Sequence, residues 1–286
     1  MLTARLHHVQ WISSLGLHTL GYREWGDPNN PKVLVCVHGL TRNSEDFNTL
    51  AQELAGQFRV VAPDMPGRGR SDWLTDPSLY AVPTYVTACV ALIARLNPGS
   101  LYWLGTSMGG LIGMAYASLP GNPIKRLILN DVGPSLSFPA LERIGQYVGK
   151  PLKFMSREEG RAYIRSISEP FGPHSEVQWK ALADSVLVEQ GTHWTTHYDP
   201  NIAHAFKNLS AENTQLHEAA LWAAYDNIHA DTLVIRGEHS DLLSRQTAQA
   251  MSQRGPKPRV IEVAEVGHAP TFMQSDQIQI VRDFLI

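Results

Sequence analysis

A serine stands between two glycines in the stretch LYWLGTSMGGLIGMAYASL, which covers residues 101–119. Gly105, Ser107 and Gly109 form the pattern G-x-S-x-G. The apolar run before the pattern is typical of a strand and the run after it of a helix, so Ser107 falls on a strand-to-helix turn. Such a turn holds a serine in a strained conformation with its hydroxyl exposed, and the following helix points its first amides at the same place. We therefore predict that Ser107 is a nucleophile.

A serine hydroxyl is a weak nucleophile at its ordinary pKa and needs a neighbouring base. The chain has 12 histidines, and His268 lies in EVAEVGHAP, between the last strand-like run and the last helix-like run. That position is a loop at the carboxyl edge of a parallel sheet, where ligands bind in open α/β folds. The turn that carries Ser107 belongs to the same edge. We predict His268 as the general base.

Other histidines receive a different interpretation. His38 also ends a strand-like run, but Gly39 follows directly, and we assign His38 another role. His193 and His197 stand four residues apart in HWTTH, a spacing that metal ligands use. The glutamate of H-E-x-x-H is missing and no third ligand lies nearby. We interpret both as structural or surface residues and expect no metal site.

The base needs a carboxylate that holds its tautomer and stabilises the imidazolium. The stretch VIRGEHSDLLS offers Asp241 in the loop after the next-to-last strand-like run, and we predict Asp241 as this acid. Its rivals are Glu238 in the same loop and Asp131, which ends the run LILND. Asp131 reaches the same edge of the sheet and is retained as the alternative acid.

Acyl transfer also needs hydrogen-bond donors for the negative charge that forms on the attacked oxygen. One donor should be the backbone N–H of Met108, directly after the nucleophile. The second should come from the loop after VLVCVHG, where Leu40 is the best position and Gly39 keeps the loop tight. Both assignments rest on position, because a backbone amide donates whatever its side chain is.

The elements that must position these residues follow from six short apolar runs. Each is rich in β-branched residues, as in strands buried on both faces of a sheet. The runs cover residues 32–39, 58–64, 100–105, 125–131, 231–237 and 258–264. Helical patterns occur at residues 44–56, 83–96, 107–119, 243–252 and 275–285.

Strands that alternate with helices predict a mostly parallel, doubly wound α/β sheet with helices on both faces. Near the N-terminus, LHHVQWI and LHTLGYREWG predict a hairpin that forms an antiparallel edge, which gives eight strands. The alternation stops between residues 134 and 227, where helical signals, proline and glycine dominate without a clear buried strand. This segment holds 11 of the 24 aromatic residues. We predict a helical cap, residues 134–227, inserted into a core of residues 1–133 and 228–286, with a few aromatic side chains facing the cleft.

Composition argues against several other classes of function. The net charge is −3 with 18% charged residues, so nothing predicts binding to nucleic acid or to anionic lipid. No run of 18 apolar residues predicts a membrane-spanning helix, and His7 and His8 interrupt any signal-peptide core. Cys36 and Cys89 form no disulfide framework and are interpreted as buried thiols. We expect a cytoplasmic protein, either a monomer or a homodimer.

A glycine-rich stretch, PDMPGRGRSDW at residues 63–73, also requires interpretation. It is not G-x-G-x-x-G, and the acid that follows in dinucleotide-binding domains is missing. Two arginines in such a loop could hold a phosphate. We interpret Arg68 and Arg70 instead as surface residues or as residues that lock the loop.

Six stretches of the chain together resemble the α/β-hydrolase superfamily, and most closely its bacterial esterase-like hydrolases with a helical cap. They are HGLTRN, DMPGRGRSDW, GTSMGG, LNDVGP, RGEHSDLLS and VGHAP. The resemblance runs from about Gly21 to the C-terminus in the expected order. It implies no cofactor and the site residues Ser107, Asp241 and His268 with the amides of Leu40 and Met108. The acid stands four residues after Gly237, whereas many relatives have three.

The residue type at position 107 separates the chemistries of this superfamily. Haloalkane dehalogenases and epoxide hydrolases carry an aspartate there, so Ser107 argues against both. The resemblance implies a carboxylesterase that cleaves small to medium apolar esters through an acyl-enzyme, with hydroxyacid oligoesters among the substrates considered. C–C hydrolases of ring-fission products, lactonases, perhydrolases and non-catalytic ligand receptors remain alternatives. A basic pocket for a substrate carboxylate would favour the C–C hydrolase, with Arg42 and Arg143 as candidate donors.

Overall fold

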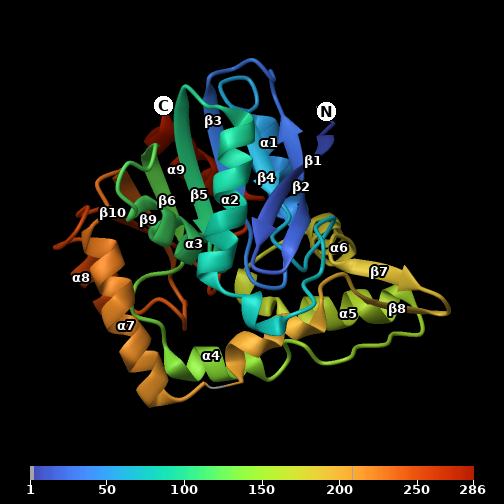
Figure 1. Ribbon diagram of the computed structural model, residues 1–286. Coiled ribbons are helices and arrows are strands. Elements are labelled where there is room, and N and C mark those ends of the chain that lie inside the picture. The colour runs from blue at the N-terminus through green and yellow to red at the C-terminus, as the bar shows by residue number, and fades with distance from the viewer. Residues whose placement is uncertain (1–2, 208) are drawn as a thin grey trace.

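The computed structural model describes residues 3–207 and 209–286. An eight-stranded sheet forms its centre, and Figure 1 shows the helices arranged around it. The strand order is β1-β2-β4-β3-β5-β6-β9-β10. Six neighbouring strands run parallel: β3 (Lys32–Val37), β4 (Arg59–Pro63), β5 (Ser100–Thr106), β6 (Ile124–Asn130), β9 (Asp231–Gly237) and β10 (Arg259–Val263). The six apolar runs of the sequence are therefore strands, each to within two residues.

The N-terminal hairpin closes one edge of this sheet. It consists of β1 (Arg5–Ser13) and β2 (Gly16–Trp25), which pair antiparallel to each other. Strand β2 then pairs antiparallel with β4. The predicted mostly parallel sheet with an antiparallel N-terminal edge is confirmed.

Side chains of the central strands alternate between two separate hydrophobic cores. On β3, Val33, Val35 and Val37 join one core, while Leu34 and Cys36 join the other. This burial on both faces explains why the strands are continuously apolar rather than alternately polar. Cys36 on this strand and Cys89, which lies in the helix of residues 82–96, are both buried free thiols.

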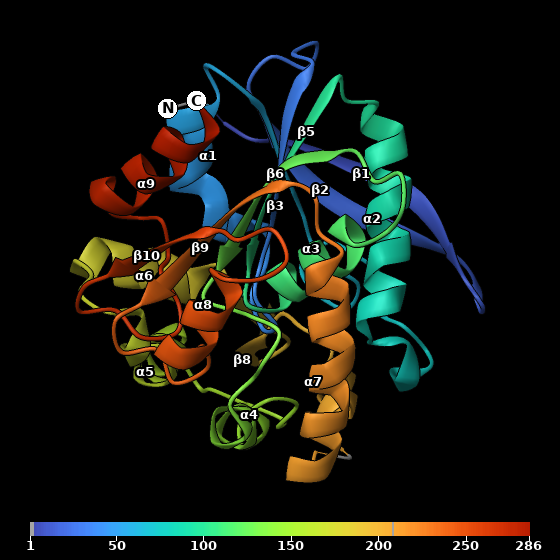
Figure 2. The same ribbon diagram turned by 90° about the vertical axis from the view of Figure 1, so that its left-hand side faces the viewer.

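Helices cover both faces of the sheet (Figure 2). The core that contains Val35 is covered by α2 (Val82–Leu96), α3 (Met108–Ala117) and α8 (Arg245–Met251), with further side chains from the segment between β6 and β9. Two contribute to the opposite core: α1 (Asn48–Leu54) and α9 (Ser275–Leu285). The structure therefore has the three layers that the alternation of strands and helices predicts.

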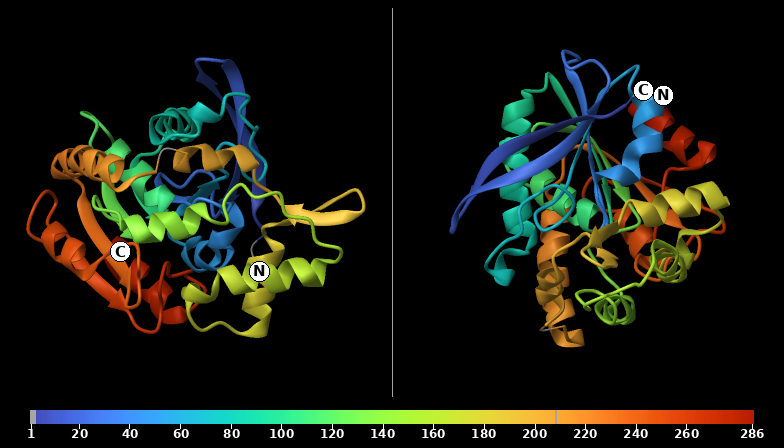
Figure 3. Two further views of the ribbon diagram at one scale, coloured as in Figure 1. Left: turned by 90° about the horizontal axis from the view of Figure 1, so that it is seen from below. Right: turned by 90° about the vertical axis from the view of Figure 1, so that its right-hand side faces the viewer.

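Residues 134–227, here called the inserted segment, connect β6 to β9 and lie across the carboxyl edge of the sheet (Figure 3). In its described residues, 134–207 and 209–227, the segment has four α-helices: α4 (Phe138–Gly145), α5 (Arg157–Ile167), α6 (Glu176–Asp184) and α7 (Ala211–Asp226). Each begins after a serine whose hydroxyl accepts a hydrogen bond from a first-turn amide, and these serines are Ser137, Ser156, Ser175 and Ser210. A small core around Phe154 and Ile164 belongs to the segment alone.

A short hairpin in the inserted segment is a difference from the all-helical expectation. Strands β7 (Leu187–Gln190) and β8 (His193–Thr196) pair antiparallel outside the main sheet. Each strand has four residues, and only Leu187 among them is buried. A polar, largely exposed pair of short strands carries no apolar periodicity, so the sequence pattern could not indicate it.

Candidate active site

The backbone at Ser107 has the strained geometry that the G-x-S-x-G pattern predicts. Ser107 lies between the end of β5 and the start of α3, with φ +51° and ψ −114°. A non-glycine residue rarely adopts a positive φ, because its Cβ crowds the backbone. A Cβ on Gly105 would lie 2.2 Å from the carbonyl oxygen of Gly109, and one on Gly109 would lie 2.0 Å from that of Val37. The two glycines are therefore required for this tight turn.

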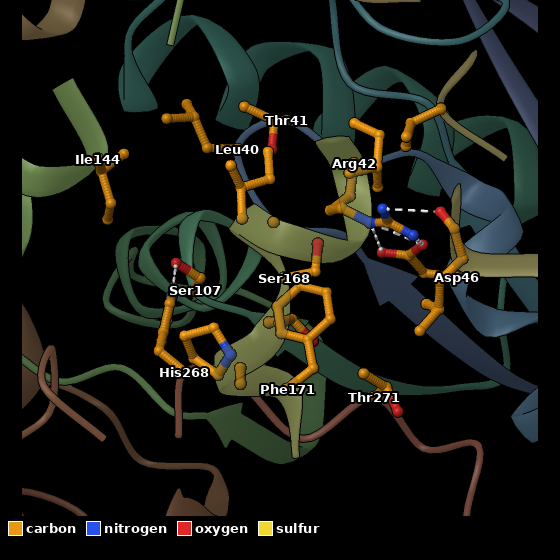
Figure 4. Close-up of a pocket in the computed structure, with 18 of the residues that line it drawn as sticks. Leu40, Thr41, Arg42, Asp46, Ser107, Ile144, Ser168, Phe171, His268 and Thr271 are labelled. Atoms are coloured by element: carbon orange, nitrogen blue, oxygen red, sulfur yellow. Dashed lines mark hydrogen bonds and ion pairs between the residues drawn. The ribbon is translucent and has the colours of Figure 1, made fainter. Parts of the chain in front are cut away.

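His268 and Asp131 extend from Ser107 in a line of hydrogen bonds. Figure 4 shows the two labelled side chains side by side, and Nε2 of His268 lies 2.9 Å from Oγ of Ser107. Nδ1 of His268 lies 2.7 Å from Oδ2 of Asp131. Asp131 directly follows β6 and is fully buried, and its carboxylate also accepts hydrogen bonds from the Gly237 amide at 2.9 Å and the Ser240 hydroxyl at 2.7 Å. These donors fix the carboxylate against the imidazole.

The expectation that Asp241 lies beside His268 is wrong. The Asp241 side chain is 46% exposed and pairs with Arg143, with 2.7 Å between Nη2 and Oδ2. Ser240 precedes it and donates to Asp131, so the loop after β9 directs the next side chain away from the imidazole. The other rival, Glu238, accepts the amide of Glu265. The structure therefore brings the alternative acid, Asp131, to His268.

The backbone amides of Met108 and Leu40, the predicted oxyanion donors, belong to the two segments beside Ser107. Met108 is the first residue of α3, so its N–H has no intrahelical partner. Leu40 follows β3 and lines the same pocket as Ser107. The peptide that carries the Leu40 N–H has its carbonyl on Gly39, and that oxygen lies 2.7 Å from Nδ1 of His38.

His38 fixes the plane of this Gly39–Leu40 peptide. Its Nε2 accepts the amide of Met65 at 2.9 Å, so the neutral ring carries its proton on Nδ1 and donates it to the Gly39 carbonyl. Complete burial lowers the pKa of His38 to about 3, so the ring remains neutral. A hydrogen bond to a peptide carbonyl polarises the peptide and strengthens its N–H as a donor.

A pocket above Ser107 and His268 lies between the sheet and the inserted segment (Figure 4). Its walls are mostly apolar, with Ile144, Ile164, Leu182 and Val186 from the inserted segment. Aromatic side chains of the inserted segment also line it: Tyr147, Tyr163, Phe171 and Tyr198. Hydroxyl groups are interspersed among them, on Thr41, Thr106, Ser168 and Thr271. Such a mixture suits a small aliphatic ligand that carries several hydrogen-bonding oxygens.

Comparison with known proteins adds a second line of evidence. The family model described as "Alpha/beta hydrolase family" matches residues 34–281, which is most of the chain. The chain belongs to the alpha/beta hydrolase family. It is also 51% identical over 284 residues to the 3-hydroxybutyrate-oligomer hydrolase of Cupriavidus necator, covering 98% of this chain and 97% of that protein.

Solved structures of other alpha/beta hydrolases share the whole architecture. A putative hydrolase from Rickettsia typhi has a TM-score of 0.88 at 31% identity, covering 99% of this chain and 98% of that one. An alpha/beta hydrolase from Novosphingobium aromaticivorans has a TM-score of 0.86 at 35% identity, covering 100% and 99% of the two chains. These matches extend through the inserted segment as well as the sheet.

In this alpha/beta hydrolase, Arg68 holds the loop that carries Leu40. Its side chain is fully buried, and its Nε donates to the Leu40 carbonyl at 2.8 Å. Its Nη1 donates to the Pro66 carbonyl and the Tyr85 hydroxyl, each at 2.7 Å, and the guanidinium lies 5.3 Å from the Tyr85 ring centre. Arg68 is thus a loop-locking residue, whereas Arg70 is exposed. No sequence pattern distinguished the two arginines.

His197 connects the inserted segment to the core of the hydrolase. Its Nδ1 accepts the amide of Gly69 at 2.8 Å, and burial lowers its pKa to about 3. His193 lies apart from it in β8, opposite Gln190. Within residues 3–207 and 209–286, no group of three His, Cys, Asp or Glu side chains could hold a metal ion. None of the described helices has both the length and the apolar character needed to cross a membrane.

Proposed function

We propose that the chain is a serine ester hydrolase in which Ser107 is the nucleophile, His268 the general base and Asp131 the acid. The observation that carries this proposal is the line of two hydrogen bonds from Ser107 through His268 to Asp131, at the floor of an apolar pocket. A serine, a base and an acid in this geometry are the requirements for acyl transfer.

The geometry assigns each group a step. Because the Asp131 carboxylate accepts the proton on Nδ1, Nε2 of His268 is free to accept the proton of Ser107 as its oxygen attacks the ester carbonyl. The amides of Leu40 and Met108 stabilise the oxyanion. His268 then returns the proton to the leaving alcohol, and an acyl-enzyme remains on Ser107. Water attacks this intermediate by the same route and releases the acid.

We propose short oligoesters of small hydroxyacids as the substrates. The 51% identical relative is named for hydrolysis of 3-hydroxybutyrate oligomers, and the identity extends over nearly the whole chain. The pocket supports this choice because its aliphatic walls fit short alkyl groups. Its hydroxyls, for example those of Thr106 and Ser168, can donate hydrogen bonds to the repeated ester oxygens.

We also propose that residues 134–227 act as a cap on a core formed by residues 1–133 and 228–286. Side chains of the loop after β3 attach the cap from the core side. Arg42 donates to the Leu182 carbonyl at 3.0 Å, and Asn43 donates to the Ser185 carbonyl at 2.6 Å. This attachment holds Leu182 in the wall of the pocket that contains Ser107, where Leu182 and Ile144 exclude water from the acyl-enzyme.

The test is hydrolysis of 3-hydroxybutyrate dimer and trimer by the purified protein, with the products identified by mass spectrometry. A p-nitrophenyl butyrate assay measures simple esterase activity in parallel. We expect the wild-type protein to release 3-hydroxybutyrate and the Ser107→Ala variant to release none. If the protein turns over a ring-fission diketone faster than the oligoesters and p-nitrophenyl butyrate, the bond that it cleaves by preference is a C–C bond rather than an ester bond. Turnover that survives in Ser107→Ala would refute the mechanism.

A further inference from the structure

The ion pair between Arg143 and Asp241 joins the inserted segment to the core. Arg143 lies on α4 and lines the pocket, whereas Asp241 lies in the core loop after β9. Nε and Nη2 of Arg143 lie 2.9 and 2.7 Å from a single oxygen, Oδ2, of Asp241. For Nη1 of Arg143, no acceptor lies within hydrogen-bond distance in the described part of the chain. The guanidinium therefore retains donors for a ligand.

The other arginine of the pocket is already neutralised. Arg42 is 10% exposed and donates to both carboxylate oxygens of Asp46. It also donates to the Leu182 carbonyl and the Ser185 hydroxyl. Asp46 lines the pocket together with Arg42, so this pair offers a ligand no net charge.

Arg143 is different because its counter-ion is outside the pocket lining. Three charged side chains are found among the described lining residues, namely Arg42, Asp46 and Arg143. Removing Asp46 from Arg42 would leave a largely buried charge without its partner, which is costly. Asp241 is 46% exposed, so water can solvate it when it leaves Arg143, and an exposed pair of this kind contributes only about 0–1 kcal/mol.

We propose that Arg143 binds the free carboxylate of a hydroxyacid oligoester and that Asp241 is the resting counter-ion which this carboxylate displaces. The planar guanidinium fork matches a carboxylate in two parallel hydrogen bonds, whereas it now contacts one oxygen only. The inference rests on the proposed function, because an oligoester of hydroxyacids ends in a carboxylate and a simple alkyl ester does not.

The direction of the substrate follows from its chemistry. When Ser107 attacks an ester carbonyl of such an oligomer, the leaving alcohol is the part that bears the terminal carboxylate. A carboxylate held by Arg143 therefore belongs to the leaving group, and the acyl part remains on Ser107. We expect the enzyme to shorten oligomers from their carboxyl end.

A purely structural role for the Arg143–Asp241 pair, which joins α4 to the loop after β9, predicts a different result. If the pair only holds the two elements together, loss of either partner weakens the contact between them equally and affects all substrates alike. If Arg143 binds the substrate, the two partners act in opposite directions. Loss of Arg143 weakens binding of a carboxylate, and loss of Asp241 removes a competitor and strengthens it.

The experiment compares 3-hydroxybutyrate trimer as the free acid with its methyl ester. The measured quantity is the ratio of KM for the acid to KM for the methyl ester. We expect Arg143→Gln to raise this ratio about tenfold, equivalent to about 1.4 kcal/mol, and Asp241→Asn to lower it. The matched control is Arg254→Gln, which breaks an exposed pair with Asp226 outside the pocket and should leave the ratio as it is.

Binding of the trimer acid to Ser107→Ala, measured by calorimetry, separates this inference from the proposed function. Affinity that falls when Arg143→Gln is added supports the carboxylate site even if the wild-type protein fails to cleave the trimer. If the KM ratio changes in the same direction in Arg143→Gln and Asp241→Asn, or changes in neither, the proposed carboxylate site is overturned. The ion pair then has a structural role only.

Discussion

The carboxylate of Asp131 lies 2.7 Å from Nδ1 of His268, although 137 residues separate them in the chain. The contact arises because Asp131 directly follows β6, the strand that pairs with β5, which leads to Ser107. Asp131 and Ser107 therefore lie at the carboxyl ends of adjacent strands, and His268 reaches both of them from the loop after β10. Asp131 is fully buried in this position, so water does not compete for its hydrogen bond to the imidazole.

Replacement of Asp131 should remove most of the catalytic rate. Asp131→Asn offers an amide in place of the carboxylate, so His268 is held in the wrong tautomer and its imidazolium is no longer stabilised. We expect kcat on p-nitrophenyl butyrate to fall about 10³–10⁴-fold. Circular dichroism establishes that the variant is folded.

The variant Asp241→Asn discriminates between the two acids. Its kcat on p-nitrophenyl butyrate, an ester without a carboxylate, should stay at least about a hundredfold above that of Asp131→Asn. Glu238→Gln in the same loop is a further control. The reverse order of the two variants would return the catalytic role to Asp241.

Ser107 should be the site of covalent modification. A fluorophosphonate is expected to label the wild-type protein once, at Ser107, because His268 activates that hydroxyl and the amides of Leu40 and Met108 stabilise the phosphonyl oxygen. Peptide mapping by mass spectrometry locates the label. Ser107→Ala should not react, whereas Ser118→Ala, at the other end of α3, should react like the wild type. A label elsewhere, or none, would favour a hydrolase-like receptor.

Local patterns were sufficient to single out Ser107 and His268, which the structure places within hydrogen-bond distance of each other. Ser107 could be predicted because its glycines are neighbours in the sequence and their contacts with Gly109 and Val37 require glycine. The strands could be predicted because both faces are buried, which makes each one continuously apolar. His268 followed from its place after the last strand.

Which aspartate contacts His268 could not be decided from the sequence, because it depends on the order of strands in the sheet. Asp131 and Asp241 both follow parallel strands at the same edge, after β6 and β9. In the sheet β6 is next to β5, and β9 is one strand further away. With either aspartate the order along the chain is Ser, Asp and His, so chain order does not discriminate between them. The role of His38 was also hidden, since its tautomer depends on the amide of Met65, 27 residues later.

Arg68 should influence catalysis through the position of Leu40. A lysine in its place keeps the charge but cannot donate to the Leu40 carbonyl, the Pro66 carbonyl and the Tyr85 hydroxyl together. We expect Arg68→Lys to lower kcat about tenfold to a hundredfold with a smaller change in KM, since loss of a whole oxyanion donor costs about 10²–10³. Arg70→Lys, at an exposed position two residues away, is the control.

Affinity for a trifluoromethyl ketone, which forms an oxyanion on Ser107, distinguishes positioning from folding. It should fall in Arg68→Lys in parallel with kcat/KM. If the melting temperature falls while kcat and the affinity for the ketone are retained, Arg68 contributes to the fold alone.

Two buried histidines should make the protein sensitive to acid. The pKa values of His38 and His197 are lowered by burial to about 3, and in each ring the nitrogen that would be protonated accepts a backbone amide. Below pH 6.5 the unfolded chain binds protons at these histidines while the folded protein does not. The free energy of unfolding therefore decreases as the pH falls from about 6.5 toward 3, with a slope of about 1.4 kcal/mol per pH unit for each histidine.

Urea denaturation at pH 7.5, 6.0 and 5.0 measures this slope. His197→Gln keeps an acceptor for the Gly69 amide but does not titrate, so its free energy of unfolding should fall less steeply with acid than that of the wild type. The difference between the two slopes isolates His197 from the carboxylates, which titrate in both proteins. His8→Gln, on the exposed side of β1, should retain the wild-type slope. Equal slopes for wild type and His197→Gln would show that His197 is protonated without unfolding the protein.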